Sequence, residues 1–256
     1  MSILSQHIPE LESMKKYPLE LFYNGNLELL TRKKISIVGT RKPSKYSRTA
    51  IQNISLALSN AGICIVSGGA MGIDAIAHNG AGANNTIAIL PCGIDIRYPS
   101  VNKNLLANIE KQGLLLTQFR DGATARPYSF VLRNEIVVAL GDILIVGEAD
   151  LNSGSMRSVE FALEMGKEIY VLPQRIGESS ATNKLLEEGK AKAIYDVDKF
   201  ISKFSNIVSK NSDDFLEYCK HNPTYEEAVK KFPTRVFEAE LSGEIEIKNA
   251  TIYINI

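Results

Sequence analysis

Six short, almost wholly apolar runs recur through the chain at nearly even spacing, and they constrain its fold more than any other feature. They are ISIV (35–38), ICIVS (63–67), TIAIL (86–90), LLLTQF (114–119), ILIV (143–146) and IYVLP (169–173). A strand with one exposed face alternates apolar and polar residues, whereas these runs do not, as expected for strands buried on both faces. They therefore predict a mostly parallel sheet that is covered on both sides.

Helix-like segments separate the apolar runs, at 46–61, 71–80, 102–112, 130–141 and 155–166. A regular succession of strand, helix and strand is typical of repeated βαβ units. A closed barrel would need more units than this stretch supplies. We therefore predict an α/β fold with a doubly wound, mostly parallel sheet.

The two ends of the chain differ from this α/β block, which we place at 31–200. Residues 1–30 hold a short amphipathic pattern, and we interpret them as a short N-terminal lead-in packed on the sheet. A polar stretch at 201–212 is interpreted as a linker. Residues 213–256 would then form a small second domain.

The C-terminal segment 213–256 contains the parts of a winged helix. Three short helix-like segments, with Thr224 and Thr234 as candidate caps, precede two alternating runs that match a hairpin. Many winged-helix domains bind duplex DNA, but this segment carries a net negative charge. Contact with a protein is therefore at least as compatible with the pattern as contact with DNA.

Charge and composition narrow the class of protein only a little. The 256 residues hold 29 Lys and Arg against 29 Asp and Glu, so no global basicity indicates a nucleic-acid partner. Residues 31–175 nevertheless carry 16 basic against 11 acidic residues, which permits an anionic ligand there. The chain has no apolar run of 18 residues and no signal-like start, so we expect a cytoplasmic protein without a membrane span.

Three cysteines, Cys64, Cys92 and Cys219, are widely scattered and form no CxxC pair. This spacing argues against a disulfide framework and against a structural zinc site. Cys64 and Cys92 lie in apolar runs, so we expect them to be inert buried thiols. We expect no metal site and no cofactor.

Four donor-rich segments are expected at the edge of the sheet where the parallel strands end, which is where such folds bind ligands. An arginine there can grip a phosphate bidentately, glycines at a helix start expose N–H groups to an anion, and an aromatic ring can stack on a base. The candidate residues are Gly39, Thr40 and Arg41, then Ser67, Gly68 and Gly69, then Phe130, Arg133 and Asn134, then Asn152, Ser153 and Gly154. Together they predict a groove for phosphorylated ligands.

Other interpretations of these residues stay open on the pattern alone. Arg41 could be a solvated loop residue, and Phe130 and Arg133 could be core and surface residues. Asp74 and His78, four apart on one helix, could form a metal pair or, with better support, a cap or an ion pair. The chain has neither the GxGxxG fingerprint nor the GxxxxGK[ST] loop, and no nucleophile–base pair is evident. We therefore expect binding without catalytic residues.

Six motifs in order resemble the DNA-processing protein A (DprA/Smf) family over roughly residues 8–196. They are GTRKPSKYS, SGGAMGIDAIAH, LPCGIDIRYP, SFVLRNEIVVAL, EADLNSGSMRSVEFALEMGKEIYVLPQ and TNKLLEEGKAKAIYD. The resemblance implies an extended Rossmann-like fold that binds single-stranded DNA without hydrolysing nucleotide. It also implies a homodimer that acts in natural transformation, protecting incoming strands and helping to load the RecA recombinase.

The resemblance also implies which residues contact DNA. Arg41, Phe130 and Lys167 are the expected contacts, completed by the Ser67–Gly69 and Asn152–Gly154 loops. The chain departs from the family at two commonly basic positions, which are Glu135 and Glu160 here. These acidic residues predict a weaker or narrower cationic groove.

An enzyme is the alternative interpretation. Nucleoside-monophosphate phosphoribohydrolases share a related fold and use a PGGxGTxxE loop with acidic catalytic residues. The stretch SGSMRSVE is a distorted version of that loop, and Glu160 falls near the expected carboxylate. The proline and the paired glycines are missing, so DNA binding is the favoured interpretation.

Overall fold

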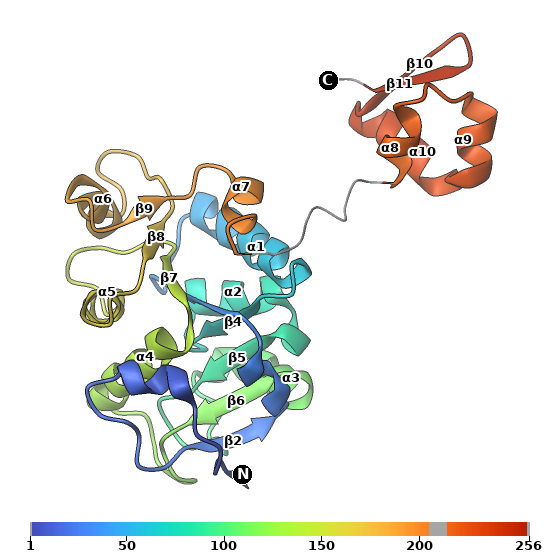
Figure 1. Ribbon diagram of the computed structural model, residues 1–256. Helices are drawn as coiled ribbons and strands as arrows, with labels where there is room; N and C mark the ends of the chain where they lie inside the picture. Colours follow the sequence, from blue (N-terminus) through green and yellow to red (C-terminus); the bar gives the residue numbers. More distant parts are fainter. Residues whose placement is uncertain (1, 205–213, 255–256) are drawn as a thin grey trace. The chain divides into compact units, whose positions relative to one another are not determined.

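The structure is a computed structural model that describes residues 2–204 and 214–254. The chain divides into two compact units, Met1–Asn206 and Ile207–Ile256 (Figure 1). Within the described residues, no helix is long and apolar enough to span a lipid bilayer.

A nine-stranded sheet forms the centre of the first unit, in the order β1-β2-β6-β5-β4-β3-β7-β8-β9. The strands are β1 Ser2–Ile3, β2 Phe22–Gly25, β3 Lys34–Val38, β4 Cys64–Ser67, β5 Thr86–Ile89, β6 Leu114–Thr117, β7 Ile143–Val146, β8 Ile169–Val171 and β9 Lys192–Ala193. Strands β3 to β9 run parallel, while β1 and β2 are antiparallel to their neighbours. Because the chain winds from β3 to one edge and then to the other, the predicted doubly wound fold is confirmed.

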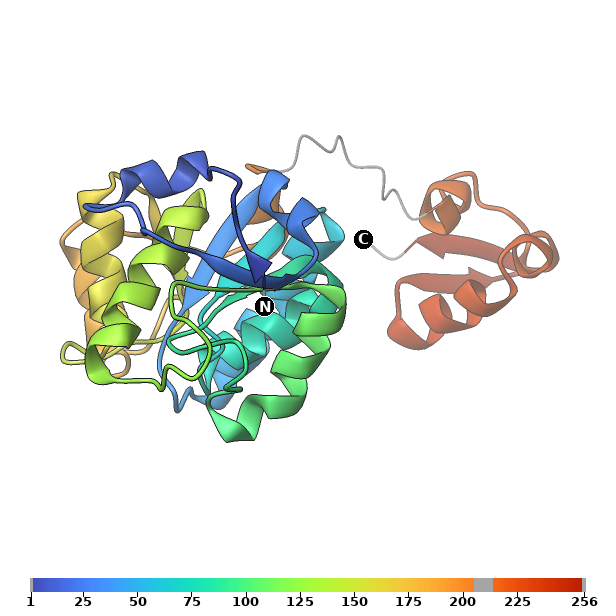
Figure 2. The ribbon, with the colours of Figure 1, turned by 90° about the horizontal axis from the view of Figure 1, so that it is seen from below.

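Helices cover both faces of this sheet, which explains why the six strands predicted from apolar runs have so few polar residues (Figures 1 and 2). One face packs against α1 Lys45–Asn60, α2 Ile73–Ala81, α3 Lys103–Gln112 and α7 Val197–Ile201. The other face packs against the 3₁₀ helix η1 Pro9–Ser13, α4 Pro127–Leu140, α5 Ser155–Glu164 and α6 Ser180–Glu187. Three further 3₁₀ turns are η2 Leu27–Thr31, η3 Ala83–Asn85 and η4 Ser100–Asn102.

The N-terminal segment is more than the lead-in that the sequence predicts. It packs on the sheet through η1, but it also extends the sheet, because β2 pairs with β6 and β1 pairs with β2. The first unit also continues beyond 200, since Phe204 packs edge-on against Tyr170 with ring centroids 6.1 Å apart. The linker predicted at 201–212 lies mostly outside the described residues.

The second unit contains three helices and a hairpin. The helices are α8 Asp214–Cys219, α9 Tyr225–Lys231 and α10 Pro233–Ser242, and the antiparallel strands are β10 Ile245–Lys248 and β11 Thr251–Ile254. Thr224 caps α9 as predicted, in a reciprocal capping box with Glu227. The predicted cap Thr234 is wrong, because α10 already begins at Pro233 and Thr234 lies inside its first turn.

All three cysteines are buried and free, as expected for Cys64 and Cys92. Burial raises the pKa of Cys64 to about 12 and that of Cys92 to about 11. Both thiols therefore stay protonated at neutral pH, and a protonated thiol is a poor nucleophile.

Candidate functional site

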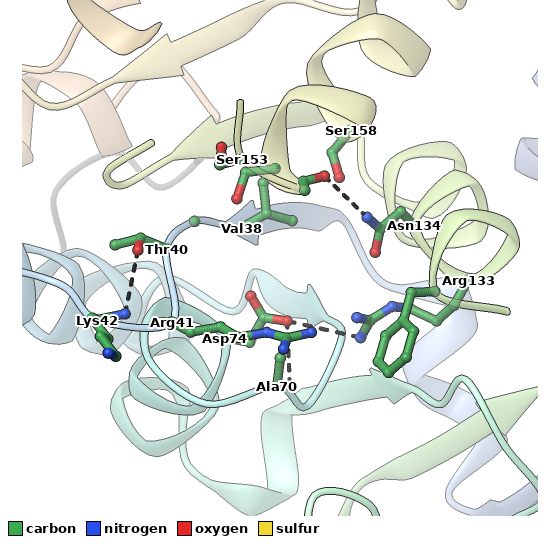
Figure 3. Close-up of a pocket in the computed structure, with 14 residues that line it drawn as sticks. Val38, Thr40, Arg41, Lys42, Ala70, Asp74, Arg133, Asn134, Ser153 and Ser158 are labelled. Atoms are coloured by element: carbon green, nitrogen blue, oxygen red, sulfur yellow. Dashed lines mark hydrogen bonds and ion pairs between the residues drawn. The ribbon is translucent and has the colours of Figure 1, made fainter. Parts of the chain in front are cut away.

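A pocket of about 380 Å³ lies where β3 and β7 end, between their loops, the start of α2 and the first turns of α4 and α5 (Figure 3). Eight of the predicted site residues line it: Gly39, Thr40, Arg41, Phe130, Arg133, Asn134, Ser153 and Gly154. Lys42, Asp74 and Ser158 also line it, although they are not among the predicted site residues. The structure thus brings residues from three of the four predicted segments to one place.

The loop that carries Arg41 is held by Glu148, the second residue after β7. The Thr40 N–H donates to the Glu148 carbonyl at 2.8 Å, and the Ser44 N–H and hydroxyl both donate to Glu148 Oε2 at 2.9 Å. Arg41 itself is exposed and forms no ion pair with any residue in the described part of the chain. Its guanidinium carbon lies 5.5 Å from the centre of the Phe130 ring, a cation–π distance. A cation is therefore held over the pocket with its charge still available.

Arg133 lies at the base of the pocket and is only 4% exposed. Its guanidinium donates to the carbonyls of Gly68 and Ile89 and forms an ion pair with Asp74, with nitrogen and oxygen 3.8 Å apart. A Cβ at position 68 would overlap the guanidinium, so a larger residue there would require Arg133 to move. Burial lowers the pKa of Arg133, while Asp74 opposes that change. Its guanidinium therefore belongs to an internal network rather than to the open surface.

In the glycine loop after β4, a backbone N–H that was predicted to bind an anion already donates to a side chain of the protein. The Ala70 N–H donates to Asp74 Oδ2 at 3.3 Å, so a side chain of α2 already fills the predicted anion site. Ser67, Gly68 and Gly69 are buried, and the Ser67 hydroxyl donates to the Ile37 carbonyl at 2.6 Å. These three residues support the pocket without lining it.

Of the alternatives for Asp74, the structure shows the ion pair, made with Arg133, whereas the N-cap of α2 is Gly72 and has no side-chain cap. Burial raises the pKa of Asp74, while Arg133 and the Ala70 N–H oppose the rise. His78 instead contacts the Thr86 hydroxyl at 2.6 Å, and burial lowers its pKa to about 3, so it is neutral at physiological pH. The described residues hold no cluster of three or more groups that could bind a metal ion.

The opposite wall of the pocket comes from the loop after β7 and the start of α5. The hydroxyls of Ser153 and Ser158 are buried and have no hydrogen-bond partner among the described residues, and the same is true of Arg133 Nε. Buried polar groups almost always have a partner, so several unpartnered ones around one pocket point to a polar ligand. Asn152 is exposed and does not line the pocket.

Lys167 does not lie where the sequence predicts. It precedes β8, at the edge of the sheet where the parallel strands begin, whereas Arg41 and Phe130 lie at the edge where they end. Its Nζ donates to the carbonyls of Ala139 and Gly141, each at 2.5 Å, at the end of α4. The resemblance groups Lys167 with Arg41 and Phe130 as DNA contacts, but the structure places Lys167 at the opposite edge of the sheet from those two residues.

The position of Lys167 leads to a prediction about stability. Burial lowers its pKa from the usual 10.5 to about 8. Between these values the folded state has lost a proton that the unfolded state still binds, so Lys167 contributes a rise in the free energy of unfolding with pH from 8 to 10.5, seen as the difference between the wild type and a variant without this amine. Lys167→Met should lose this rise while keeping DNA affinity, measured by urea unfolding across that pH range and by an oligonucleotide titration. A variant with weaker DNA binding and normal pH dependence would contradict this assignment.

The two acidic departures from the family lie outside the pocket. Glu135 is buried and accepts the Lys15 N–H at 3.1 Å, while Glu160 is exposed and pairs with Arg157 at 2.6 Å. Because neither carboxylate lies in the pocket, the structure does not support the expectation that Glu135 and Glu160 weaken or narrow the cationic groove. The enzyme alternative also loses support, because Glu160, the carboxylate that it places near the ligand, does not line the pocket.

A doubly wound sheet with a cationic pocket beyond its strand ends defines a Rossmann-like protein suited to anionic ligands. The family model of DNA recombination-mediator protein A matches residues 2–205. The chain belongs to this family.

Curated relatives are about one third identical to the chain over the residues that align with it. The DNA processing protein DprA of Streptococcus pneumoniae is 37% identical over 193 residues, covering 73% of this chain and 68% of that protein. The Bacillus subtilis DprA is 32% identical over 190 residues, which are 72% of this chain and 64% of that protein. The Escherichia coli protein Smf is 34% identical over 186 residues, which are 71% of this chain and 50% of that protein. The chain therefore spans between half and about two thirds of the length of these relatives.

Two solved structures share the fold closely. The Helicobacter pylori DNA processing protein A, described for its single-stranded DNA binding mode, gives a TM-score of 0.78 at 38% identity and covers 79% of this chain and 94% of that one. The S. pneumoniae DprA structure gives a TM-score of 0.72 at 34% identity, and the match covers 77% of this chain and 70% of that one.

Proposed function

We propose that this chain binds single-stranded DNA and holds backbone phosphates in the pocket beside Arg41. The observation that carries the proposal is the combination, in one pocket, of an exposed guanidinium and the buried hydroxyls of Ser153 and Ser158, none of which has an ion-pair or hydrogen-bond partner among residues 2–204 and 214–254. Guanidinium and hydroxyl groups are donors that phosphate oxygens accept well. A relative with the same fold is described as a single-stranded DNA binder, which supports this choice of ligand.

The same geometry favours binding over catalysis. Of the carboxylates at the pocket, Asp74 is paired with Arg133 and Glu148 is bonded to Ser44. The Ser44 hydroxyl and the Glu148 carboxylate that accepts from it do not line the pocket, so they are not placed as nucleophile and base toward a ligand bound there. We therefore propose that the pocket holds the strand and leaves it chemically unchanged.

A gel-shift comparison of single- and double-stranded oligonucleotides of one sequence tests this proposal. We expect single strands to bind more tightly, because a flexible strand can place a phosphate inside a pocket while its bases turn toward the protein. Equal affinity for both forms, or no binding of either, would contradict the proposal.

The affinity for DNA should depend only weakly on salt. A protein that neutralises Z phosphates of a single strand gives a log–log slope of roughly −0.7 Z, and we expect about two to four such contacts at this pocket. The slope should therefore lie between about −1.4 and −3, measured by fluorescence anisotropy over a range of potassium chloride concentrations. A slope steeper than about −6 would indicate a long basic surface rather than a pocket.

We further propose that the chain acts in natural transformation as a homodimer that protects incoming strands and helps load RecA. Family membership supports these roles. Of the three, the homodimer is the one that a single measurement can test most directly. Two linked pockets would raise avidity on long strands, because the second binding event becomes intramolecular. Sedimentation should give the mass of two chains, and a single-chain mass at concentrations that bind DNA would contradict this part of the proposal.

The second unit is proposed to be a winged-helix-like domain that contacts a protein. The exposed residues of α10 include Phe237, Glu238, Glu240 and Leu241, which are apolar or acidic. Acidic side chains repel the DNA backbone, so this helix is poorly suited to lie against a duplex.

A further inference from the structure

A small hollow adjoins the phosphate pocket on the side of the loop before η4. Met71, Tyr98 and Pro99 line it, together with Arg41 and Phe130, which also line the larger pocket. Its volume is about 20 Å³, so a nucleobase cannot enter it and would have to lie across its rim. Because the two cavities share walls, a phosphate in one and a flat group on the other would be close neighbours.

The Phe130 ring is already surrounded by other side chains. The Arg41 guanidinium carbon lies 5.5 Å from its centre, that of Arg133 lies 6.0 Å away, and Tyr98 meets it edge-on with centroids 5.9 Å apart and an interplanar angle of 64°. A base could stack fully on Phe130 only by displacing one of these groups. The ring is therefore better placed to position Arg41 and Tyr98 than to receive a base.

Tyr98, in contrast, offers surface to a ligand. Tyr98 is 41% exposed and Met71 is 43% exposed, and both line the same hollow. The loop is held by backbone hydrogen bonds, from the Tyr98 N–H to the Ile96 carbonyl at 3.0 Å and from the Asn102 N–H to the Pro99 carbonyl at 2.9 Å. The exposed ring of Tyr98, on this hydrogen-bonded loop, and the polarisable thioether of Met71, just before α2, form an apolar surface beside the cationic pocket.

We propose that Tyr98 and Met71 form a subsite for a nucleobase of the strand whose phosphate lies beside Arg41. The inference rests on the proposed binding of single-stranded DNA and identifies the part of the nucleotide that each cavity takes. Stacking on a ring face does not depend on which base is present, so the subsite is expected to tolerate all four bases.

The test compares two ligands of equal length, an oligothymidylate carrying one 2-aminopurine and an oligonucleotide made only of abasic sites. Tyr98→Ala should bind the first about 5- to 100-fold more weakly, the loss that corresponds to one stacked base. It should bind the abasic strand as the wild type does, because no base is present to stack. Tyr98→Phe should retain affinity and the stacking-dependent quenching of 2-aminopurine fluorescence.

Two further variants make the outcome specific. Tyr98→Leu keeps apolar bulk in the loop without a ring, and it should reproduce the alanine result even if the alanine variant folds poorly. Tyr128 is 58% exposed at the start of α4 but lines neither cavity, so Tyr128→Ala should leave both affinities unchanged.

Two results would overturn the subsite: equal losses on the base-containing and abasic strands, or equal losses in the Tyr98 and Tyr128 variants. If the wild type binds no single-stranded DNA, the proposed function fails. If it binds normally and Tyr98→Leu does too, only the subsite fails.

Discussion

Replacing Arg41 by alanine is expected to weaken single-stranded DNA binding by about 10- to 100-fold, which corresponds to the roughly 1.5–3 kcal/mol of a hydrogen bond to a charged group. The guanidinium is exposed, unpaired among the described residues and held over Phe130, so it loses little on meeting a phosphate. The salt slope should also become shallower by about 0.7, because one counterion-releasing contact is gone. Fluorescence anisotropy at several salt concentrations measures both effects.

Two controls separate this contact from a general loss of positive charge. Arg41→Lys keeps the charge but not the fork-shaped donor, so it should keep the salt slope and recover only part of the affinity. Arg175 is also exposed and follows β8 at the same edge of the sheet, but it does not line the pocket. Equal losses in Arg175→Ala and Arg41→Ala would mean that the pocket is not the binding site.

Replacing Arg133 by alanine is expected to lower the free energy of unfolding by about 3–5 kcal/mol, because it leaves Asp74 buried without its partner. The variant should also lose DNA affinity, since Arg133 bonds the Gly68 carbonyl and packs near Phe130. Urea unfolding of the wild type and the variant measures the loss of stability. This effect on stability distinguishes Arg133 from Arg41, whose replacement should leave unfolding nearly unchanged.

A double variant tests the ion pair itself. Asp74→Asn removes the buried charge that Arg133→Ala would leave unpaired, so the double variant should lose less stability than the two single losses added together. Strict additivity would mean that the two side chains do not act as a pair.

The sheet was predictable because burial on both faces leaves a simple signature. All six apolar runs became strands that begin and end within two residues of the predicted bounds. The missed strands lack that signature: β9 has only two residues, and β2 is the short stretch FYNG with one fully buried residue. Strands this short are held by their neighbours in the sheet rather than by their own composition.

The role of Arg133 could not be predicted from the sequence, whereas the position of Lys167 could. Nothing in SFVLRNEIVVAL shows that the Arg133 side chain would reach the Gly68 carbonyl 65 residues away, although the glycine-rich loop does signal a close approach. Lys167 was predictable from topology alone. A residue just before a strand lies at the opposite edge from the loops that follow the strands, so Lys167 could not join the Arg41 pocket.

A crystal structure of the protein with a short oligothymidylate would show most directly whether a phosphate binds beside Arg41. We expect a backbone phosphate in the 380 Å³ pocket, accepting hydrogen bonds from the Arg41 guanidinium and from the hydroxyl of Ser153 or Ser158. A strand bound elsewhere on the protein, with no phosphate within hydrogen-bond distance of Arg41, would contradict this expectation.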